Sequence, residues 1–421
     1  MDFSLTEEQT MLKDSVNRFL EKNFSFEQRR KMLADRQPMN AQLWAGLASL
    51  GVLGVPFSPD DGGFGGGGVE TMLVMEALGR HLTLEPYLAT VVLAGGCVAL
   101  GAAEWQKKIL LPKIIDGSLI LAFAHAEPKA RFDLGLVETR ATREGNNFVL
   151  EGEKSLVLHG SVAEKFIVSA RTAGSSADAR GVTLFIVEAD EENLGGREYP
   201  LFDGTRALDL QLSGVKVGPE SVIGALDQAM PLIDAVLDRA MAALCAEAVG
   251  IMDALHAATV EYLKTRQQFG QPIGRFQALQ HRAVDMFVQL EQARSMALLA
   301  ASKVDSTDVF ERRRTVAAAK DMAGRAGRFV GQQAIQLHGG MGMTDELNVS
   351  HYFKRLTAID VLFGNSASQR TRFATMKEGG ATAHMVPPRK SWVRIYTSPQ
   401  RRKDAKETQR KTCELKIREG C

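Results

Sequence analysis

Cysteine is scarce in this chain of 421 residues. The four cysteines, Cys97, Cys245, Cys413 and Cys421, form no CxxC pair and have no short spacing. A chain of this length with 45% apolar residues can bury large cores of its own, so no disulfide framework is expected and the predicted location is the reducing cytoplasm. The eight histidines form no HxxxH pair and have no cysteine partner, so the sequence predicts no metal site.

Signals for export and for membrane insertion are also lacking. The segment Met1–Glu8 is acidic and has neither a basic region nor an apolar region, so it is not a signal peptide. Residues 86–103 carry no charge, and a run of about 20 apolar residues could span a bilayer. Gly95, Gly96 and Gly101 interrupt this run, which favours a buried core helix.

An excess of one charge is absent from the chain as a whole, whose net charge is +1, so the balance does not indicate a nucleic-acid partner. The charge is uneven, however, because residues 381–421 hold 11 Lys and Arg against 4 Asp and Glu. A nucleic-acid or membrane patch is one interpretation of this basic tail. An unrelated, largely disordered extension is the other, and it is favoured because no apolar face accompanies the charge.

The pattern of apolar residues changes along the chain. Helical spacing of apolar residues, opened by a capping box at Ser4-x-x-Glu7, gives way to β-rich runs such as 182–187. Long Ala-rich helical segments follow from about residue 230, and short turns join them. The sequence therefore predicts an α+β protein of four parts: an N-terminal helical domain (1–118), a middle antiparallel β-barrel domain (119–226), a C-terminal four-helix bundle (227–380) and the basic tail (381–421).

A glycine run, 62–68, interrupts the first helical part. Bare backbone amides can cradle a phosphate, which would make the run a phosphate-binding loop. The run lacks the GK[ST] ending and no strand clearly precedes it, so a flexible loop is the favoured interpretation.

Two segments carry residues suited to a dinucleotide. One is Arg266-x-x-Phe269-Gly270 with Gln277 beyond it, and the other is the segment 336–342, Gln-Leu-His-Gly-Gly-Met-Gly. A guanidinium pairs with a diphosphate through a rigid fork of donors, and glycines allow close approach of a ligand, although they also end helices. Arg266 alone could be an ordinary surface residue at a helix end. The combination favours binding.

These segments resemble the acyl-CoA dehydrogenase family, and the resemblance covers about residues 1–378. It implies an FAD cofactor whose diphosphate and adenosine half is bound across a subunit interface. The residues implied in that half are Arg266, Phe269, Gln277, Gln336, Gly339 and Gly340.

The strand-like segment Leu121–Pro128 and the segment 151–158 resemble the family's flavin-contacting strands less closely. Ala126 stands where the family has a Thr, and Leu156 and Leu158 stand where it has Trp and Thr. The residues implied around the flavin are Phe123, His125, Ala126, Leu156, Leu158 and Gln369. The resemblance is therefore stronger at the diphosphate end of the cofactor than at its ring.

The catalytic base is the residue that the sequence lacks most conspicuously. Alignment with the family's last motif puts Asn365 at the base position, where an amide cannot accept a proton. Other members carry the base on the first long helix of the bundle, near Ala240, which is not acidic either. On that helix Glu247 is a weak candidate for a functional role, and Asp238 is expected to form an exposed pair with Arg239.

The resemblance implies an FAD-dependent α,β-dehydrogenation of an acyl-CoA to the 2-enoyl-CoA. It further implies a homo- or hetero-tetramer with a related large subunit, and electron-transfer flavoprotein as the acceptor. Within the family the chain looks closest to the small subunits of pimeloyl-CoA-type heteromeric dehydrogenases. The alternative is a non-catalytic partner subunit that completes a cofactor site and lacks the base.

Overall fold

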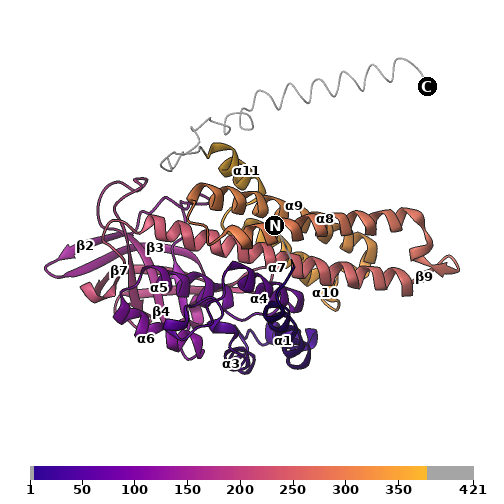
Figure 1. Cartoon of the computed structure of the whole chain (residues 1–421), viewed down its shortest axis with the longest axis horizontal. Coiled ribbons are helices and arrows are strands. Elements are labelled where there is room, and N and C mark those ends of the chain that lie inside the picture. Colours follow the sequence, from indigo (N-terminus) through magenta and orange to yellow (C-terminus); the bar gives the residue numbers. More distant parts are fainter. Residues whose placement is uncertain (1–3, 377–421) are drawn as a thin grey trace, which may run out of the picture. The chain divides into compact units, whose positions relative to one another are not determined.

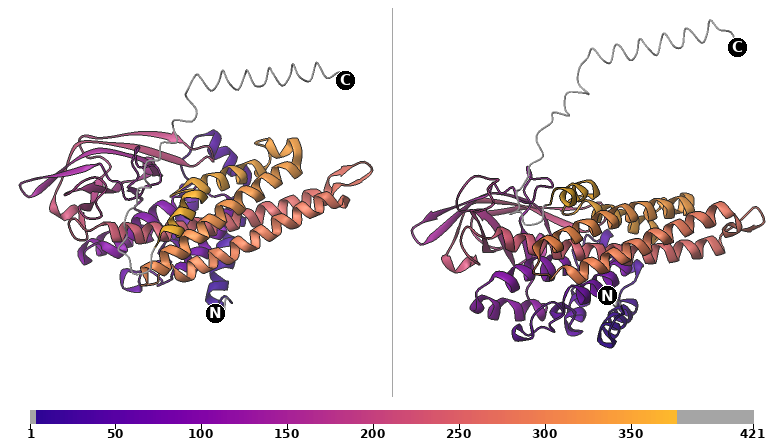
Figure 2. Two further views of the ribbon diagram at one scale, coloured as in Figure 1. Left: turned by 90° about the horizontal axis from the view of Figure 1, so that it is seen from above. Right: turned by 45° about the horizontal axis from the view of Figure 1, so that its top comes forward.

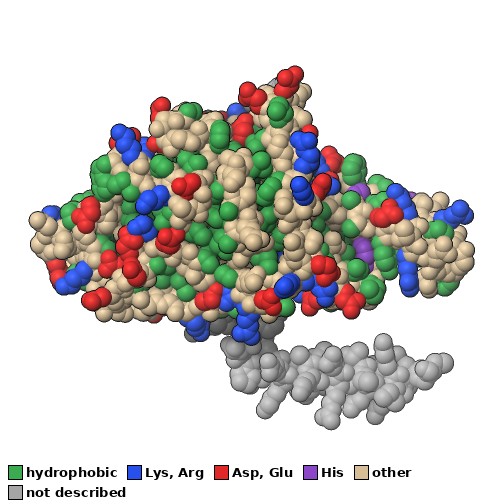
Figure 3. All heavy atoms as spheres, turned by 90° about the horizontal axis from the view of Figure 1, so that it is seen from below, with side chains coloured by type: hydrophobic (Ala, Val, Ile, Leu, Met, Phe, Trp, Pro, Cys, Tyr) green, Lys and Arg blue, Asp and Glu red, His purple; other side chains and the backbone are tan. Residues whose placement is uncertain are grey.

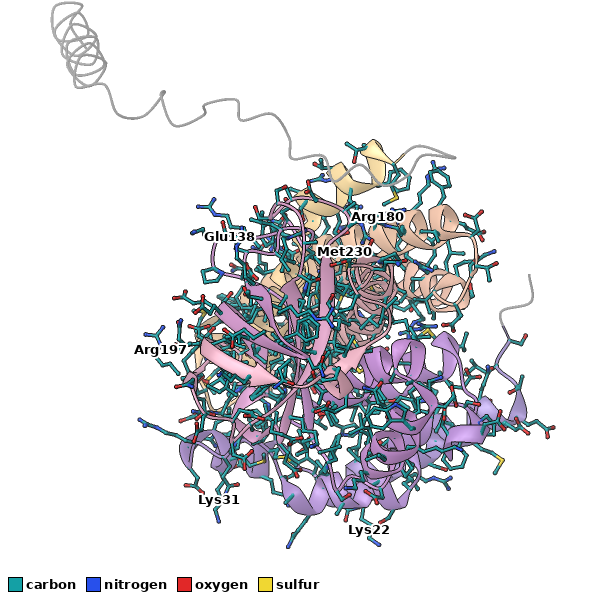
Figure 4. All side chains as sticks on the ribbon, turned by 90° about the vertical axis from the view of Figure 1, so that its left-hand side faces the viewer. Lys22, Lys31, Glu138, Arg180, Arg197 and Met230 are labelled. Atoms are coloured by element: carbon teal, nitrogen blue, oxygen red, sulfur yellow. The ribbon has the colours of Figure 1, made fainter. Side chains whose placement is uncertain are left out.

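The computed structural model describes residues 4–376, in which helical segments precede and follow the large sheet along the chain (Figure 1). The basic tail predicted for residues 381–421 lies outside the described residues. The order of helices, strands and helices agrees with the predicted α+β class. Charged side chains such as Lys22, Lys31 and Arg197 project outward from these elements (Figure 4).

The first helices begin at capped residues. The Thr6 hydroxyl accepts a hydrogen bond from the Gln9 amide, and the Gln9 side chain accepts one from the Thr6 amide, so the capping box lies two residues beyond the predicted one. The helices of this part are α1 (Glu7–Asn23), α2 (Phe26–Ala34), α3 (Ala41–Ser49), α4 (Gly68–His81), the π-helix η3 (Tyr87–Ala94), α5 (Gly95–Gly101) and α6 (Glu104–Ile115).

Most of the uncharged stretch predicted to be a core helix, residues 86–103, is buried, whereas Leu100 and Ala103 at its end are exposed. Every residue of η3 is buried, and the Thr90 hydroxyl donates to the Leu121 carbonyl at 3.0 Å. Within residues 4–376 no helix is both long and apolar enough to cross a bilayer.

The middle part is a mixed sheet. Its strands are β1 (Leu121–Ala124), β2 (Arg140–Glu144), β3 (Asn147–Leu158), β4 (Lys165–Arg171), β5 (Val182–Glu188), β6 (Leu194–Pro200), β7 (Arg206–Val217) and β8 (Val222–Ile223). They follow the order β6-β7-β3-β2-β4-β5-β8, and β1 pairs in parallel with β4, Ala122 opposite Phe166.

The sheet corrects the prediction of a purely antiparallel barrel. Parallel pairing of β1 with β4 is possible because the connection between them is long and includes β2 and β3. The described pairings run from β6 to β8 without closing into a ring. The other principal ladders are antiparallel. A short turn joins β2 to β3, whereas β3 and β7 are far apart in the sequence.

Long helices form the C-terminal part. They are α7 (Met230–Thr265), α8 (Gln277–Lys303), α9 (Val309–His338), α10 (Asn348–Val361) and α11 (Ser366–Thr375), and the short strands β9 (Gln267–Gln268) and β10 (Gln271–Pro272) join α7 to α8. Figure 2 shows α8 and α9 running alongside α7. Gly250 permits α7 to touch α4, because a Cβ there would lie 1.9 Å from the Glu76 carbonyl oxygen.

Arg355 on α10 joins the bundle to the sheet. Its guanidinium donates to both carboxylate oxygens of Glu247 on α7, at 2.5 and 2.8 Å, and to Asp203 in the β6–β7 turn at 2.9 Å. All three side chains are largely buried. Burial by itself would lower the pKa of Arg355, but the two carboxylates reverse this and raise it above its ordinary value.

Arg29 on α2 extends this cluster into the N-terminal helices. Its guanidinium donates to the carbonyl oxygens of Leu82 and Asp203, at 2.9 and 2.8 Å. Its third partner is the His351 Nδ1 at 2.9 Å. Burial, together with the Arg29 charge, lowers the pKa of His351 to about 4, so the ring is neutral and Nδ1 accepts. The two arginines therefore connect all three parts of the chain.

Glu85, between α4 and η3, is a buried acid with only backbone partners in its hydrogen bonds. Its carboxyl oxygens accept from the Asn40 amide at 3.3 Å and from the Leu84 amide at 3.0 Å. Burial raises the pKa of Glu85 to about 7, although these bonds act in the opposite direction.

Replacement of Arg355 by Met should lower the free energy of unfolding by about 3–5 kcal/mol, because two carboxylates are left buried without their counter-ion. Urea denaturation at neutral pH measures the loss. The control is Arg30→Met, which removes a partly exposed pair with Glu27 and should cost about 1 kcal/mol or less. Equal effects of the two substitutions would contradict the role given to Arg355.

Glu85→Gln tests the buried acid through pH. A folded-state pKa above the unfolded value of 4.5 adds stability that is complete below pH 4.5 and is lost as pH rises to about 7. The free energy of unfolding of the parent should therefore fall relative to the variant across this window, by up to about 3 kcal/mol. Urea titrations at several pH values measure the difference, with Glu8→Gln on α1 as the exposed control. A difference that does not vary with pH would refute the assignment.

Candidate active site and cofactor site

A cavity of about 30 Å³ lies where the sheet meets η3, α7 and the segment before α11. Phe123 and His125 reach it from β1 and the residue beyond, and Leu156 and Leu158 reach it from β3. Ala126, Leu237 on α7 and Phe363 are also in its wall. All five strand-borne residues predicted to contact the flavin, Phe123, His125, Ala126, Leu156 and Leu158, are thus brought together.

His125 is the only ionisable residue in this wall. Its Nε2 is 2.7 Å from the Leu134 carbonyl oxygen and its Nδ1 is 2.9 Å from the Ser169 hydroxyl. Burial, and then the charge of Lys154, lowers the pKa of His125 to about 4. The ring is therefore neutral at pH 7, with Nε2 donating and Nδ1 accepting, and it has no free nitrogen to take a proton from a substrate.

A buried ion pair stands behind this wall. Lys154 Nζ lies 2.6 Å from Glu127 Oε1 and 3.1 Å from the Ser169 hydroxyl. Glu127 also accepts from the backbone amides of Glu138 and Thr139, at 2.7 and 3.0 Å. Burial lowers the pKa of Lys154 to about 8 despite the opposing effect of Glu127. The pair fixes the turn that carries His125 and Ala126.

Phe363 enters the wall from a strained segment. Its φ is +56°, in the left-handed region that a bulky side chain rarely adopts. Lys320 on α9 is fully buried, and its Nζ donates to the carbonyl oxygens of Ile359, Asp360 and Gly364 at 2.7–3.2 Å. Gln369 Nε2 donates to the Phe363 carbonyl oxygen at 2.8 Å. Gln369 therefore stabilises the backbone of this segment and does not itself line the cavity.

Asn365 lies two residues after Phe363 and has a structural role. It is the N-cap of α11, and its side-chain oxygen accepts from the Ser368 amide at 3.0 Å. The structure does not bring Asn365 into the cavity; Phe363 is the residue of this segment that faces it.

Glu247 and Asp238 on α7 are both held in ion pairs. Glu247 binds Arg355 through both oxygens. Among the described residues it lines neither the 30 Å³ cavity nor the larger cavity between α4 and α7. Asp238 is fully buried and pairs with Arg312 at 3.0 Å and Arg372 at 2.6 Å, so the expected exposed pair with Arg239 is wrong. No carboxylate remains among the residues that line the 30 Å³ cavity.

The other predicted cofactor residues gather at the far end of α7. Arg266, Phe269 and Gln277 lie at the α7–α8 turn, and the His338 ring stacks on Tyr262 at 4.4 Å, which brings Gly339 and its neighbours to the same end. The six residues of this group, called the distal group below, are Arg266, Phe269, Gln277, Gln336, Gly339 and Gly340. In Figure 1 this end lies opposite the sheet.

The distal group is open and unpaired. Within residues 4–376 the side chains of Arg266, Gln277 and Gln336 are exposed, and none of them is in a hydrogen bond or an ion pair. A Cβ added to Gly339 or Gly340 would meet nothing within 4 Å. An exposed guanidinium, two amides and a bare backbone fit a diphosphate well.

The two halves of the predicted cofactor site are far apart within one chain. Leu237 in the cavity wall and Arg266 are 29 residues apart on α7, which corresponds to about 44 Å of helix. A single FAD cannot span that distance. The residues fit the cofactor only if the distal group of one chain serves the cavity of another.

Comparison with known proteins defines the class. The chain matches the N-terminal, middle and C-terminal domains of acyl-CoA dehydrogenase at residues 6–118, 122–215 and 230–376. It is 30% identical over 377 residues to the probable acyl-CoA dehydrogenase YngJ of Bacillus subtilis, covering 88% of this chain and 98% of that protein.

Solved structures of acyl-CoA dehydrogenases and of a related complex are similar to this chain. Butyryl-CoA dehydrogenase from Megasphaera elsdenii matches with a TM-score of 0.82 and 27% identity, covering 89% of this chain and 99% of that one. A chain of the ChsE4–ChsE5 complex from Mycobacterium tuberculosis matches with a TM-score of 0.80 and 27% identity, covering 90% and 100%.

These matches and the fold define an FAD-dependent oxidoreductase that acts on CH–CH donors. The chain belongs to the acyl-CoA dehydrogenase family. The family match confirms the predicted fold, with N-terminal helical, middle sheet and C-terminal helical parts, and the predicted FAD-dependent dehydrogenation of acyl-CoA.

Sequence reasoning did not single out Phe363 or Lys320. The only sequence signal for Phe363 is its place before Gly364 in the motif that was aligned on Asn365. Lys320 follows three alanines, Ala317–Ala319, and precedes Asp321 on α9, and a buried lysine in such a setting would need several acceptors.

Phe363→Glu and Asn365→Asp form a matched pair of substitutions. The first places a carboxyl in the cavity, whereas the second keeps a helix cap and leaves the cavity unchanged. Mixing each FAD-loaded variant with acyl-CoA should give flavin bleaching at least about 100-fold faster for Phe363→Glu than for the parent, because a general base contributes roughly 10²–10⁴-fold. Thermal melting of each variant checks that it is folded.

Asn365→Asp should bleach no faster than the parent. Faster bleaching by Asn365→Asp than by Phe363→Glu would mean that residue 365, not residue 363, faces the reacting carbon.

Proposed function

We propose that this chain works as one subunit of a heteromeric acyl-CoA dehydrogenase. In this assembly its distal group holds the diphosphate half of an FAD whose ring lies in the cavity of a related catalytic subunit. An FAD held in this way would supply the acceptor for the hydride that leaves the β-carbon of the acyl-CoA. The single observation that carries this proposal is the cavity of this chain, which is lined by apolar side chains, a neutral His125 and no carboxylate.

Dehydrogenation needs a group that takes the α-proton, and a carboxylate raised in pKa by an apolar site is the usual solution in enzymes. In this chain Phe363 occupies the loop position that faces the cavity, and Glu247 and Asp238 are neutralised by arginines. In this proposal the residues of this chain therefore position and enclose the cofactor, and the proton acceptor comes from the partner subunit. An arrangement in which this chain acts only as the non-catalytic partner is the limiting case of the same proposal.

The distal end has the surface of a subunit contact. Large apolar side chains are exposed there, including Phe269 at 89%, Met343 at 71%, Val284 at 58% and Phe287 at 49%. Figure 3 shows hydrophobic side chains on this end of the molecule among charged ones. Exposed apolar groups in such number are expected to be covered by another chain.

The finer assignments follow from the same resemblance. We infer a small-subunit role like that in pimeloyl-CoA-type dehydrogenases, in a tetramer with a related large subunit, in the cytoplasm. The match to a complex, ChsE4–ChsE5, supports a heteromer. A match to a structure from work on the electron transferring flavoprotein of Acidaminococcus fermentans supports electron-transfer flavoprotein as the acceptor. The middle domain is proposed to span residues 119–226 and to have the curvature of a barrel.

Arg266→Ala tests the distal group. Loss of a charge-assisted, two-pronged contact with a diphosphate should weaken FAD binding by roughly 10–100-fold. The FAD content of the purified assembly, measured from flavin absorbance per protein, reports the loss. Arg18→Ala, which removes an exposed arginine on α1 far along the chain, is the control and should retain full FAD content.

An assembly of Arg266→Ala chains that keeps the parent's FAD content and affinity would refute the distal site. Rapid bleaching of the FAD in the isolated parent chain by an acyl-CoA, at the rate of a complete dehydrogenase, would refute the need for a partner's base.

A further inference from the structure

A second cavity, of about 230 Å³, lies between α4, η3 and α5, α7 and the end of α8. It shares no lining residue with the 30 Å³ cavity, although η3 and α7 contribute to both. Its inner wall is apolar and includes Val91, Val92, Gly96, Ala242, Ala243 and Val304. An apolar cavity of about 150 Å³ holds benzene, so this volume suits a hydrocarbon of about eight carbons.

The glycine run forms one side of the mouth. Gly66, Gly67 and Gly68 line the cavity, and a Cβ at Gly68 would lie 2.3 Å from the Ala301 carbonyl oxygen, so only glycine lets α4 begin against α8. The three amides donate to Val55, Glu70 and Asp305 respectively. They are not free to cradle a phosphate, which removes the basis for a phosphate-binding loop.

The other side of the mouth carries one anion and one cation. Asp305 Oδ1 accepts from Arg239 Nε and Nη2 at 3.0 and 2.7 Å, and its Oδ2 accepts from the Gly68 amide at 2.8 Å. The Asp305 charge is thus shared with the N-terminus of α4. Within residues 4–376, Arg239 Nη1 is in no hydrogen bond or ion pair, so a donor of a charged group remains at the mouth of an apolar cavity.

We propose that this cavity binds a medium-chain monocarboxylic acid, with its hydrocarbon chain along Val91, Val92 and Ala243 and its carboxylate on Arg239. The apolar wall takes the chain out of water, and the guanidinium gives the carboxylate a charged donor at the point where the cavity opens. Asp305 competes for the same guanidinium and so limits the affinity. This site is separate from the 30 Å³ cavity, and its existence does not depend on the proposed function.

Octanoate and 1-octanol are matched probes, because they share an eight-carbon chain and differ in charge. Isothermal titration of the purified full-length chain should show binding of both probes, with octanoate about tenfold tighter because of its charge-assisted contact. Failure of both probes to bind the folded protein would overturn the proposal. Binding of octanol alone, or equal affinity for the two, would overturn the role of Arg239.

Two substitutions at the mouth should act in opposite directions. Arg239→Gln should weaken octanoate binding about tenfold, and Asp305→Asn should strengthen it, since the competing charge is gone while an acceptor for the Gly68 amide remains. Neither should change octanol binding. A general structural disturbance would weaken both probes in both variants, and that outcome would refute the proposed carboxylate contact.

Filling each cavity in turn locates the ligand. A Cβ at Gly96 would meet only Val236, at 3.5 and 3.8 Å, so Gly96→Leu can fill the larger cavity without a backbone clash and should abolish binding of both probes. Ala126→Leu fills the smaller cavity and should leave both affinities unchanged. Thermal melting confirms folding of each variant. Binding that survives Gly96→Leu, or is lost in Ala126→Leu, places the ligand elsewhere and refutes the site.

Discussion

The pairing of one buried guanidinium, Arg355, with two carboxylates is the constraint on which the arrangement of this chain depends. Glu247 belongs to α7 and Asp203 to the β6–β7 turn, and Arg29 carries the connection on to the N-terminal helices. Each of these charges would be costly to bury alone, so the parts of the chain must meet in one geometry that satisfies all of them. That geometry closes the sheet against the bundle and creates the small cavity at the junction. It also removes Glu247 from any role as a base, because both of its oxygens are bound.

The second constraint is the segment that ends in Phe363. Its left-handed backbone is unfavourable for a bulky residue, and it is maintained by Lys320, which binds three carbonyl oxygens, and by Gln369. So many buried contacts on one short segment indicate that the direction of residue 363 matters. In this chain they direct an aromatic ring, not an acid, into the space beside the predicted flavin. The same backbone contacts would hold a carboxylate at residue 363, whereas the phenyl ring that stands there cannot accept a proton.

The length of α7 determines how the cofactor can be bound. The helix passes the cavity at Leu237 and ends at the distal group, about 44 Å further on, so the two halves of the predicted dinucleotide site lie at different ends of the helix. The proposed function therefore requires an assembly, in which a subunit without its own base contributes to the site of another. The larger cavity lies between these ends and has α7 as one wall. The glycine run packs at the mouth of this cavity, and that role is independent of the cofactor.

Much of the fold and part of the site could be predicted from the sequence. Helical spacing, strand runs, Pro231 in the first turn of α7 and the glycine-rich ends of helices are local signals, and the order of helices, sheet and helices followed from them. The motifs at Arg266 and Gly339 pointed to the family because their residues are close in sequence. The parallel pairing of β1 with β4, the ion pairs of Asp238 and Glu247, and the exchange of roles between Asn365 and Phe363 could not be read in this way. Each depends on residues that are distant in sequence and meet only after folding, and which of two neighbouring side chains faces a cavity is decided by the backbone angles that those distant contacts impose.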